Sequence, residues 1–355
     1  MKRTAVMLPM ALLVGFVLVA VFGQKSTAQP QGPYWAYGFL KPGAPGEAAP
    51  PCRDATPVSC NRPVSPVADD GVLRRVPGSS ASFPLRQIGF GYGPADWFPE
   101  DHPPAPEIVA RGREKDGVRA CALCHYHNGK GKMENAGVAG LPVNYFLQTM
   151  AAFGSGTRKS ADPRKHNTHE MIAIAKALTP AETKATAEYF ASIKWTPWIK
   201  VIETDTLPKF HATAAGLFIA ERGGGMEPLG PRVIEMPENA EQTEVFRNPR
   251  SGFVAYVPVG SVAKGEVLAT TGGATIVGGK IVPGPTIACA ICHGPDLKGI
   301  GDVPAIAGRS PSYIARQLYD MQQGTRKTDL MKAAVANLSN EDLVALAAYA
   351  ASRVP

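Results

Sequence analysis

The chain has 355 residues, 45% of them hydrophobic and 19% charged, so it can form two or three small domains with buried cores. Its formal net charge is +7, but no basic cluster with interleaved aromatic side chains accompanies that charge. The composition therefore excludes a largely disordered chain and gives no indication of nucleic-acid binding.

Residues 1–28 have the composition of a secretory signal. Lys2 and Arg3 give a positive start, an apolar run follows, and residues 26–28 are small enough for cleavage. Because the apolar run is long for a cleaved signal, an uncleaved membrane anchor is the alternative. Both interpretations predict an exported, periplasmic protein, either soluble or anchored to the inner membrane by its N-terminus.

Residues 29–104 are rich in proline and glycine and show no helical periodicity. Their aromatic side chains are too numerous for a fully solvated linker, so we expect an extended arm draped over a folded domain. A partner-docking arm is the alternative. Outside the cytoplasm Cys52 and Cys60 are expected to form a disulfide, with two free thiols as the alternative.

The pattern Cys-x-x-Cys-His occurs twice further along the chain. Its residues are Cys121, Cys124 and His125 in the first copy and Cys289, Cys292 and His293 in the second. Two thiols on one helical turn can form thioether bonds to the two vinyl groups of a haem, and the adjacent histidine can bind the iron. The sequence thus predicts two covalently bound haem c groups.

The two copies belong to a longer internal repeat. Gly-Thr-Arg-Lys at 156–159 recurs at 324–327, and Tyr145 recurs as Tyr313. After a short insertion in the first copy, Met171 aligns with Met331. We therefore expect two helical domains, at 105–196 and 260–355.

The sequence predicts where several helices begin and end. Opening helices are expected from Pro106 to about Arg113 and from Ser261 to about Ala269. Ser310 followed by proline predicts a helix start, and Thr179 and Ser339 cap the last helix of each copy.

Residues 197–259 belong to neither copy. The segments 199–203, 232–236 and 253–257 are rich in β-branched and aromatic residues and are separated by glycine and proline. They predict a β-containing connector, so the fold class is mainly α, with two small helical domains, a connector and an N-terminal arm.

A haem iron held by histidine needs a sixth ligand, and a methionine at the same position in both repeats is the natural candidate. Met171 and Met331 meet this condition, whereas Met133, Met150 and Met321 align with other residue types. At the first site His169, His166 and His127 leave a bis-histidine iron open, with His169 as the main competitor.

The sequence gives less support for a zinc site, a phosphate-binding site or a serine nucleophile. The two cysteine pairs are far apart and each has its own histidine, which argues against one zinc site. No strand-loop-helix phosphate motif and no serine-nucleophile signature was found.

Residues 105–196 and 260–355 resemble the dihaem cytochromes c built from two class I cytochrome c domains. The resemblance rests on the two Cys-x-x-Cys-His motifs, the Ala-Gly before a Tyr-led helix, the aligned methionines and the C-terminal helix. In that family a proline carbonyl holds the proximal histidine. Pro304 fits this role, and since Ala136 occupies the aligned position, His125 is expected to be held differently.

The resemblance implies an electron carrier and not an enzyme. Its partners would be a dehydrogenase as donor and a terminal oxidase or another cytochrome as acceptor. The alternatives are a dihaem enzyme, acting on peroxide or sulfur compounds, and a cytochrome subunit of a membrane dehydrogenase complex. An enzyme would need an open or displaceable ligand, which the less typical first site could provide.

Overall fold

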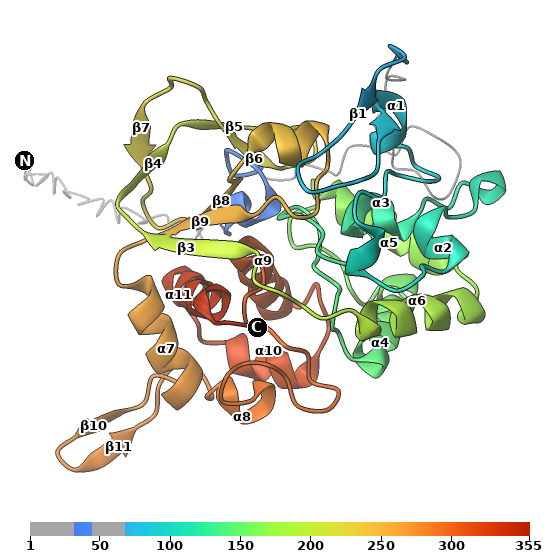
Figure 1. The fold of residues 1–355 in the computed structure, drawn as a ribbon. Coiled ribbons are helices and arrows are strands. Elements are labelled where there is room, and N and C mark those ends of the chain that lie inside the picture. The colour runs from blue at the N-terminus through green and yellow to red at the C-terminus, as the bar shows by residue number, and fades with distance from the viewer. Residues whose placement is uncertain (1–31, 45–67) are drawn as a thin grey trace, which may run out of the picture. The chain divides into compact units, whose positions relative to one another are not determined.

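The structure, a computed structural model, describes residues 32–44 and 68–355 (Figure 1). The expected signal or anchor at 1–28 and the expected disulfide between Cys52 and Cys60 lie outside the described residues. Within those two described ranges, no helix combines the length and the apolar character needed to cross a membrane.

The two repeats contain the same order of helices. The first copy has α2 (Glu107–Ala110), α3 (Cys121–His125), α4 (Val143–Gly154), α5 (His166–Ala177) and α6 (Pro180–Ser192). The second has α7 (Ser261–Thr271), α8 (Ala290–His293), α9 (Pro311–Gln322), α10 (Asp329–Val335) and α11 (Asn340–Ser352). These helices fall within the predicted ranges 105–196 and 260–355, whose boundaries remain a proposal.

The predicted helix starts are confirmed by their caps. Thr179 and Glu182 form a capping box at the start of α6, and Ser339 and Asp342 form one at the start of α11. The Ser310 hydroxyl accepts a hydrogen bond from a backbone N–H in the first turn of α9. Each side chain satisfies backbone N–H groups that have no partner inside the helix.

The first opening helix is shorter than predicted. It ends at Ala110 instead of reaching Arg113, and a separate 3₁₀ turn, η3 (Glu114–Asp116), follows. Gly112 has a φ of +70°, and a Cβ there would lie 2.3 Å from the backbone oxygen of Val118. The chain therefore turns at this glycine and cannot continue as a helix.

In the second copy α7 crosses directly over α11. A Cβ at Gly265, in the middle of α7, would lie 2.0 Å from the carbonyl oxygen of Ala345 and 2.6 Å from the Cβ of Tyr349. Glycine costs helix stability, but here it lets two backbones touch. The stripe of buried residues on α11, including Leu343 and Leu346, packs in this core as predicted.

The connector contains the three predicted strands. They appear as β3 (Ile199–Glu203), β8 (Ile234–Pro237) and β9 (Phe253–Val257), which form one sheet in the order β3-β9-β8. β3 runs parallel to β9, and β8 runs antiparallel to it. Two short hairpins lie between them, β4 (Thr206–Pro208) with β7 (Met226–Pro228) and β5 (Phe210–Ala212) with β6 (Phe218–Ala220).

The three-stranded sheet packs against α9 and α11 of the second copy (Figure 1). Glu235 of β8 is fully buried and accepts hydrogen bonds from the Ser310 hydroxyl (2.7 Å) and the Ser312 N–H (3.2 Å). Burial raises the pKa of Glu235, and the hydrogen bonds from Ser310 and Ser312 oppose this rise. The connector is thereby joined to α9.

The N-terminal segment is more ordered than an extended arm. The described part after residue 68 forms β1 (Leu73–Arg74), β2 (Phe83–Pro84), α1 (Leu85–Ile88) and the 3₁₀ turn η2 (Pro99–Asp101). Its small core consists of Val76, Ile88, Trp97 and Phe98. The prediction was an extended arm draped over a folded domain, and the structure adds this small core, against which Phe246 of the connector packs.

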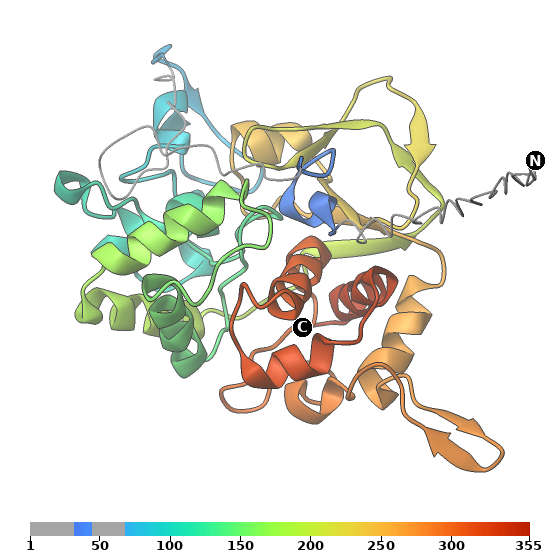
Figure 2. The same cartoon turned by 180° about the vertical axis from the view of Figure 1, so that it is seen from behind.

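The 3₁₀ helix η1 (Tyr34–Tyr37) lies against α9. The Tyr37 hydroxyl donates to Asp320 (2.7 Å), and the Arg316 guanidinium donates to the Ala36 oxygen (2.9 Å). Figure 2, which turns the molecule by 180°, shows this segment beside α9. Residues at both ends of the described chain thus share one core.

The two repeats meet through the segments that the sequence repeats. The Lys159 N–H donates to the Thr325 oxygen (2.8 Å), and the Lys327 N–H donates to the Thr157 oxygen (2.9 Å). The side chains are reciprocal as well. Arg158 donates to the Tyr313 hydroxyl (2.9 Å), and Arg326 donates to the Tyr145 hydroxyl (2.8 Å). Equivalent residues therefore form equivalent bonds across the joint.

Arg309 forms a second link between the copies. It is 4% exposed and donates to the backbone oxygens of Gly137 and Ala139, both at 2.9 Å, while its guanidinium lies over the Trp195 ring. Burial lowers the pKa of Arg309 to about 10, so it remains charged at neutral pH. A charged donor to buried carbonyls is among the stronger hydrogen bonds.

The cap of α11 predicts an acid-dependent stability. Partial burial would raise the pKa of Asp342, but hydrogen bonds from Lys264 and Ser339 outweigh it and lower the pKa. A depressed pKa stabilises the fold above about pH 4, and this contribution is lost as the pH falls through the lowered value. Asp342→Asn should cost about 1 kcal/mol at pH 7 and reduce the loss of stability in acid.

Denaturant unfolding at pH 7 and below pH 4 measures both effects. Glu341→Gln is the matched control, because Glu341 also pairs with Lys264 but is 74% exposed and takes no part in the cap. An equal effect of both substitutions would show that the ion pair, and not the cap, provides the stability.

Arg309→Ala should lower the free energy of unfolding by about 2–4 kcal/mol, because buried carbonyls lose a charged donor and Trp195 loses its stacking partner. Exposed Arg222→Ala should change it by less than about 0.5 kcal/mol. Thermal unfolding of the purified protein compares the two. Equal stability would mean that water replaces the guanidinium at this joint.

Candidate haem sites

Each Cys-x-x-Cys-His motif forms one short helix. Cys121, Cys124 and His125 lie on α3, and Cys289 caps α8, which carries Cys292 and His293. Burial raises the pKa of Cys121 and Cys124 to about 12 and that of Cys289 to about 11, so none of the three is a thiolate at neutral pH.

Both motif histidines are held in the tautomer that an iron ligand needs. His125 Nδ1 lies 2.8 Å from the Ala136 oxygen, and His293 Nδ1 lies 2.8 Å from the Pro304 oxygen. A carbonyl oxygen only accepts, so each Nδ1 carries the proton and each Nε2 keeps its lone pair. Burial also lowers the pKa of both histidines, which favours the neutral ring that binds metal.

The expectation that His125 is held differently from His293 is therefore wrong. Ala136 lies at the same separation along the chain as Pro304, and its carbonyl makes a bond of the same length. The backbone itself supplies the acceptor, because in both copies the loop after the motif brings a carbonyl oxygen to the histidine ring. Proline stiffens such a loop but is not needed to form the bond.

The proposed sixth ligands lie on equivalent helices. Met171 is on α5 and Met331 is on α10, and both are partly buried and pack against the main core. The competitors Met133, Met150 and Met321 are almost fully buried core residues. Met171 and Met331 are therefore more accessible to a bound haem than the other three methionines. Their assignment as axial ligands is a proposal.

The histidines near the first site differ in their surroundings. His166 and His169 share α5 with Met171, but residues two apart on a helix lie on different faces. His169 and Met171 therefore cannot both point at one iron from this helix. His127 is buried, and its ring stacks on that of His102 with the ring centres 5.5 Å apart.

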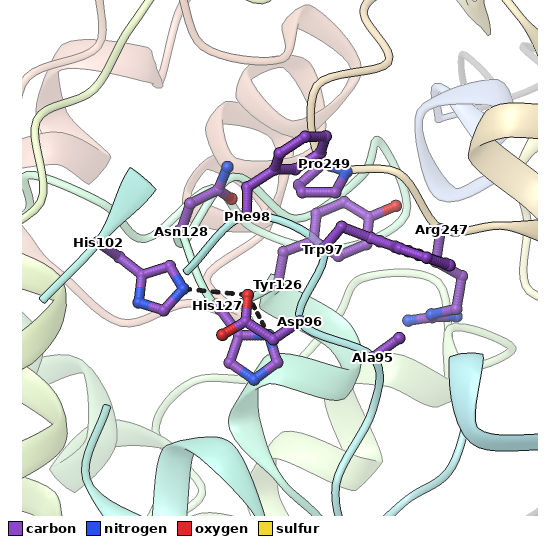
Figure 3. A pocket seen from close by; sticks show the side chains of 10 residues that line it. All are labelled: Ala95, Asp96, Trp97, Phe98, His102, Tyr126, His127, Asn128, Arg247 and Pro249. Atoms are coloured by element: carbon purple, nitrogen blue, oxygen red, sulfur yellow. Dashed lines mark hydrogen bonds and ion pairs between the residues drawn. The ribbon is translucent and has the colours of Figure 1, made fainter. Parts of the chain in front are cut away.

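The close-up in Figure 3 shows what surrounds His127. Asp96 accepts from His102 Nε2 at 3.2 Å and lies 3.9 Å from His127 Nδ1. The Tyr189 hydroxyl of α6 donates to the His127 oxygen (2.7 Å). A cavity of about 10 Å³ beside them has room for about one water molecule. These contacts give His127 a packing role between the N-terminal segment and the first copy.

A buried ion pair near the first site was not foreseen from the sequence. Lys132 and Glu134 are 5% and 2% exposed, and their charged atoms lie 2.8 Å apart. At the aligned positions the second copy has Ile300 and Asp302, which are exposed. Lys and Glu two residues apart are common on protein surfaces. This pair is unusual because other segments of the folded chain bury it.

The surroundings of the two sites therefore differ. Leu123, between the two cysteines of the first motif, is buried, and its carbonyl accepts a hydrogen bond from Arg247 of the connector. Its counterpart Ile291 is 71% exposed. The first attachment helix is covered by other parts of the chain at this position, whereas Ile291 of the second is exposed.

Comparisons with known proteins give a consistent picture. No family model matches the chain. It is 30% identical over 140 residues to cytochrome c4 of Stutzerimonas stutzeri, and this match spans 36% of the chain and 63% of that relative. It is 25% identical over 242 residues to the thiosulfate dehydrogenase electron acceptor of Thiomonas intermedia, spanning 66% of the chain and 78% of that protein.

A third relative is matched over most of its own length. The cytochrome subunit of sulfide dehydrogenase from Chlorobaculum tepidum is 32% identical over 96 residues, which are 25% of this chain and 84% of that subunit. The paired thiols and the neutral histidines with free Nε2 atoms fit haem c at both motifs. The chain therefore belongs to the c-type cytochromes, as a dihaem cytochrome built from two class I cytochrome c domains with two covalently attached haem c groups.

Proposed function

We propose that this protein is an exported electron carrier that accepts electrons from a dehydrogenase and passes them to a respiratory acceptor. The observation that carries this proposal is the pair of equivalent attachment helices, each with a histidine fixed through Nδ1 at 2.8 Å. Each haem c supplies a one-electron ferric/ferrous couple. The leader at 1–28 and the export-side attachment of haem c support a periplasmic location.

The proposed axial ligands favour transfer over substrate chemistry. His125 and Met171 would hold one iron, and His293 and Met331 the other. Methionine sulfur favours the ferrous state and leaves no open position for a substrate. Two axial ligands would fill both coordination positions of the iron. This suits a carrier, because its iron must change oxidation state with little structural rearrangement.

The joint between the repeats would keep the two domains in one arrangement. Arg158 and Arg326 reach across it to equivalent tyrosines, and backbone hydrogen bonds run beside them. A fixed joint supports transfer between two cofactors, because their separation would not depend on domain motion. Direct transfer between the haems of one chain is part of the proposal.

The printed names of the relatives suggest a donor class. One is an electron acceptor of thiosulfate dehydrogenase and another is the cytochrome subunit of sulfide dehydrogenase. We infer a dehydrogenase acting on reduced sulfur compounds as the donor, with a terminal oxidase or another cytochrome as the acceptor. Membership of a membrane dehydrogenase complex would be one form of this role.

A dihaem enzyme is the second candidate, and one observation favours it. His166 and His169 precede Met171 on the same helix, so the first iron has nitrogen donors close to its proposed sulfur ligand. Exchange of one ligand for another could open that site to peroxide or a sulfur compound. The second copy has no histidine at the corresponding helix, so only the first site would act in this way.

Substitution of the methionines tests the ligands. Met331→Ala and Met171→Ala should each remove the methionine-to-iron charge-transfer band of one haem and lower its reduction potential by on the order of 0.1 V. Spectra and redox titrations of the ferric and ferrous protein measure both effects. Met321→Leu, at a buried core position, should leave them unchanged.

If Met171→Ala preserves the spectrum of the first haem while Met331→Ala changes the second, the first iron is not bound by Met171. The variant His169→Ala then decides whether histidine takes that place. Unchanged spectra in both methionine variants would contradict the whole ligand assignment.

Reaction with small molecules separates a carrier from an enzyme. The ferric protein with both methionines bound should be low-spin, should not bind cyanide rapidly and should not consume hydrogen peroxide, because no coordination position is open. Magnetic circular dichroism and a peroxide assay check this. A high-spin component in the first haem with peroxide turnover would favour the enzyme.

A further inference from the structure

A small hairpin in the second domain exposes its apolar side chains. The strands β10 (Thr275–Val277) and β11 (Lys280–Val282) pair antiparallel, with Ile276 opposite Ile281. Both isoleucines are 76% exposed. In Figures 1 and 2 the hairpin projects away from α7 and α8. The described part of the protein covers neither side chain.

Both faces of the hairpin carry exposed apolar side chains. Side chains alternate along a strand, so Ile276 and Ile281 lie on one face while Val277 and Val282 lie on the other. Val277 is 63% exposed and Val282 is 44% exposed. An isolated two-stranded hairpin is marginally stable in water and soluble surfaces rarely expose such clusters, so this element is suited to being enclosed by a partner.

The base of the hairpin is fixed to the second haem site. A Cβ at Gly284 would lie 2.0 Å from the Gly272 oxygen, so the two strands leave α7 through a closely packed base. The Thr286 hydroxyl then donates to the Ala334 oxygen of α10 (2.7 Å), the helix that carries Met331. Cys289 follows three residues after Thr286. Any molecule that encloses the hairpin is thus held beside the second haem site.

Apolar side chains also flank the second haem site. Ile287 is 51% exposed, Ile291 is 71% exposed, and Leu330, which precedes Met331, is 65% exposed. In the first copy, the counterpart of Ile291 is buried beneath the connector through Arg247.

The charges define the kind of molecule. Between Val267 and Pro295 the only Lys, Arg, Asp or Glu is Lys280. The hairpin itself thus has one charge among its exposed apolar side chains, and binding through apolar side chains depends little on salt. The outer edges of both strands also have no neighbour in the described sheets. Unpaired backbone groups are costly within a bilayer, whereas a protein groove can pair with them.

We propose that the hairpin 275–282 inserts into an apolar groove of a redox partner protein and places that partner beside the second haem. This inference rests on the proposed carrier function and assigns the second domain as its docking end. The partner is a protein with an uncharged groove close to its own redox centre, and it offers a strand edge or backbone groups to the hairpin.

The test uses the full dihaem protein with Ile276→Ser and Ile281→Ser combined. Stopped-flow spectroscopy follows oxidation of the ferrous protein by washed respiratory membranes of the source organism. It also follows reduction of the ferric protein by purified thiosulfate dehydrogenase with thiosulfate. Ferricyanide serves as an oxidant that needs no docking. The matched control is Leu73→Ser, because Leu73 is 61% exposed on the other small hairpin, β1–β2.

We expect the double variant to react at least about tenfold more slowly with one or both protein probes, since two apolar anchors are lost. Its reaction with ferricyanide should be unchanged, and Leu73→Ser should behave as wild type throughout. The wild-type rate with the affected probe should change by less than about twofold between low and moderate salt.

Wild-type rates in the double variant with both protein probes would overturn the docking proposal and leave the carrier function intact. A wild-type protein that reacts with neither probe would overturn both. Binding to protein-free phosphatidylethanolamine–phosphatidylglycerol vesicles that the double variant loses would assign the hairpin to lipid and overturn the proposal. A wild-type dimer that becomes monomeric in the double variant would assign it to a second copy, with the same consequence.

Discussion

The hydrogen bond from each motif histidine to a carbonyl further along the chain governs the chemistry of both sites. It fixes the proton on Nδ1, orients the ring and leaves Nε2 for iron. The loops that return the carbonyl depend on Gly131 and Gly299, which have φ values of +68° and +84°. A Cβ would lie 2.6 Å from the Ala136 oxygen at the first and 2.6 Å from the Val303 oxygen at the second.

The same constraint operates in two different environments. Around the first histidine, the N-terminal segment and the connector cover the attachment helix and enclose the Lys132–Glu134 ion pair. Around the second, the corresponding side is exposed and carries the hairpin. Two haems with equal proximal bonds would therefore differ in solvent access and local charge, both of which affect a reduction potential.

The joint between the copies shows how a duplicated sequence can form its own interface. Residues 157–159 pair with 325–327, and Arg158 and Arg326 reach equivalent tyrosines in the opposite copy. Burial would raise the pKa of Tyr145, but Arg326 and Arg158 outweigh it and lower the pKa to about 7.

The sequence alone determined the local features. The motif Cys-x-x-Cys-His predicts haem c because its two thiols and its imidazole lie on one turn of helix. The caps at Thr179, Ser310 and Ser339 were predicted because they depend on residues within one turn. The repeat gave equivalent helices and aligned Met171 with Met331, whose ligation remains a proposal. The strands of the connector followed from their β-branched residues, near the predicted positions.

Contacts between distant residues were decided only by the tertiary structure. Phe246 of the connector packs against the core around Trp97 and Phe98, and the ion pair of Lys132 with Glu134 is buried only because other segments cover it. The hydrogen bond of His125 to Ala136 was missed because the prediction looked for proline, although a backbone carbonyl is available in every residue. Local patterns specify helices, caps and motifs, whereas burial and cover depend on where the folded chain brings remote segments together.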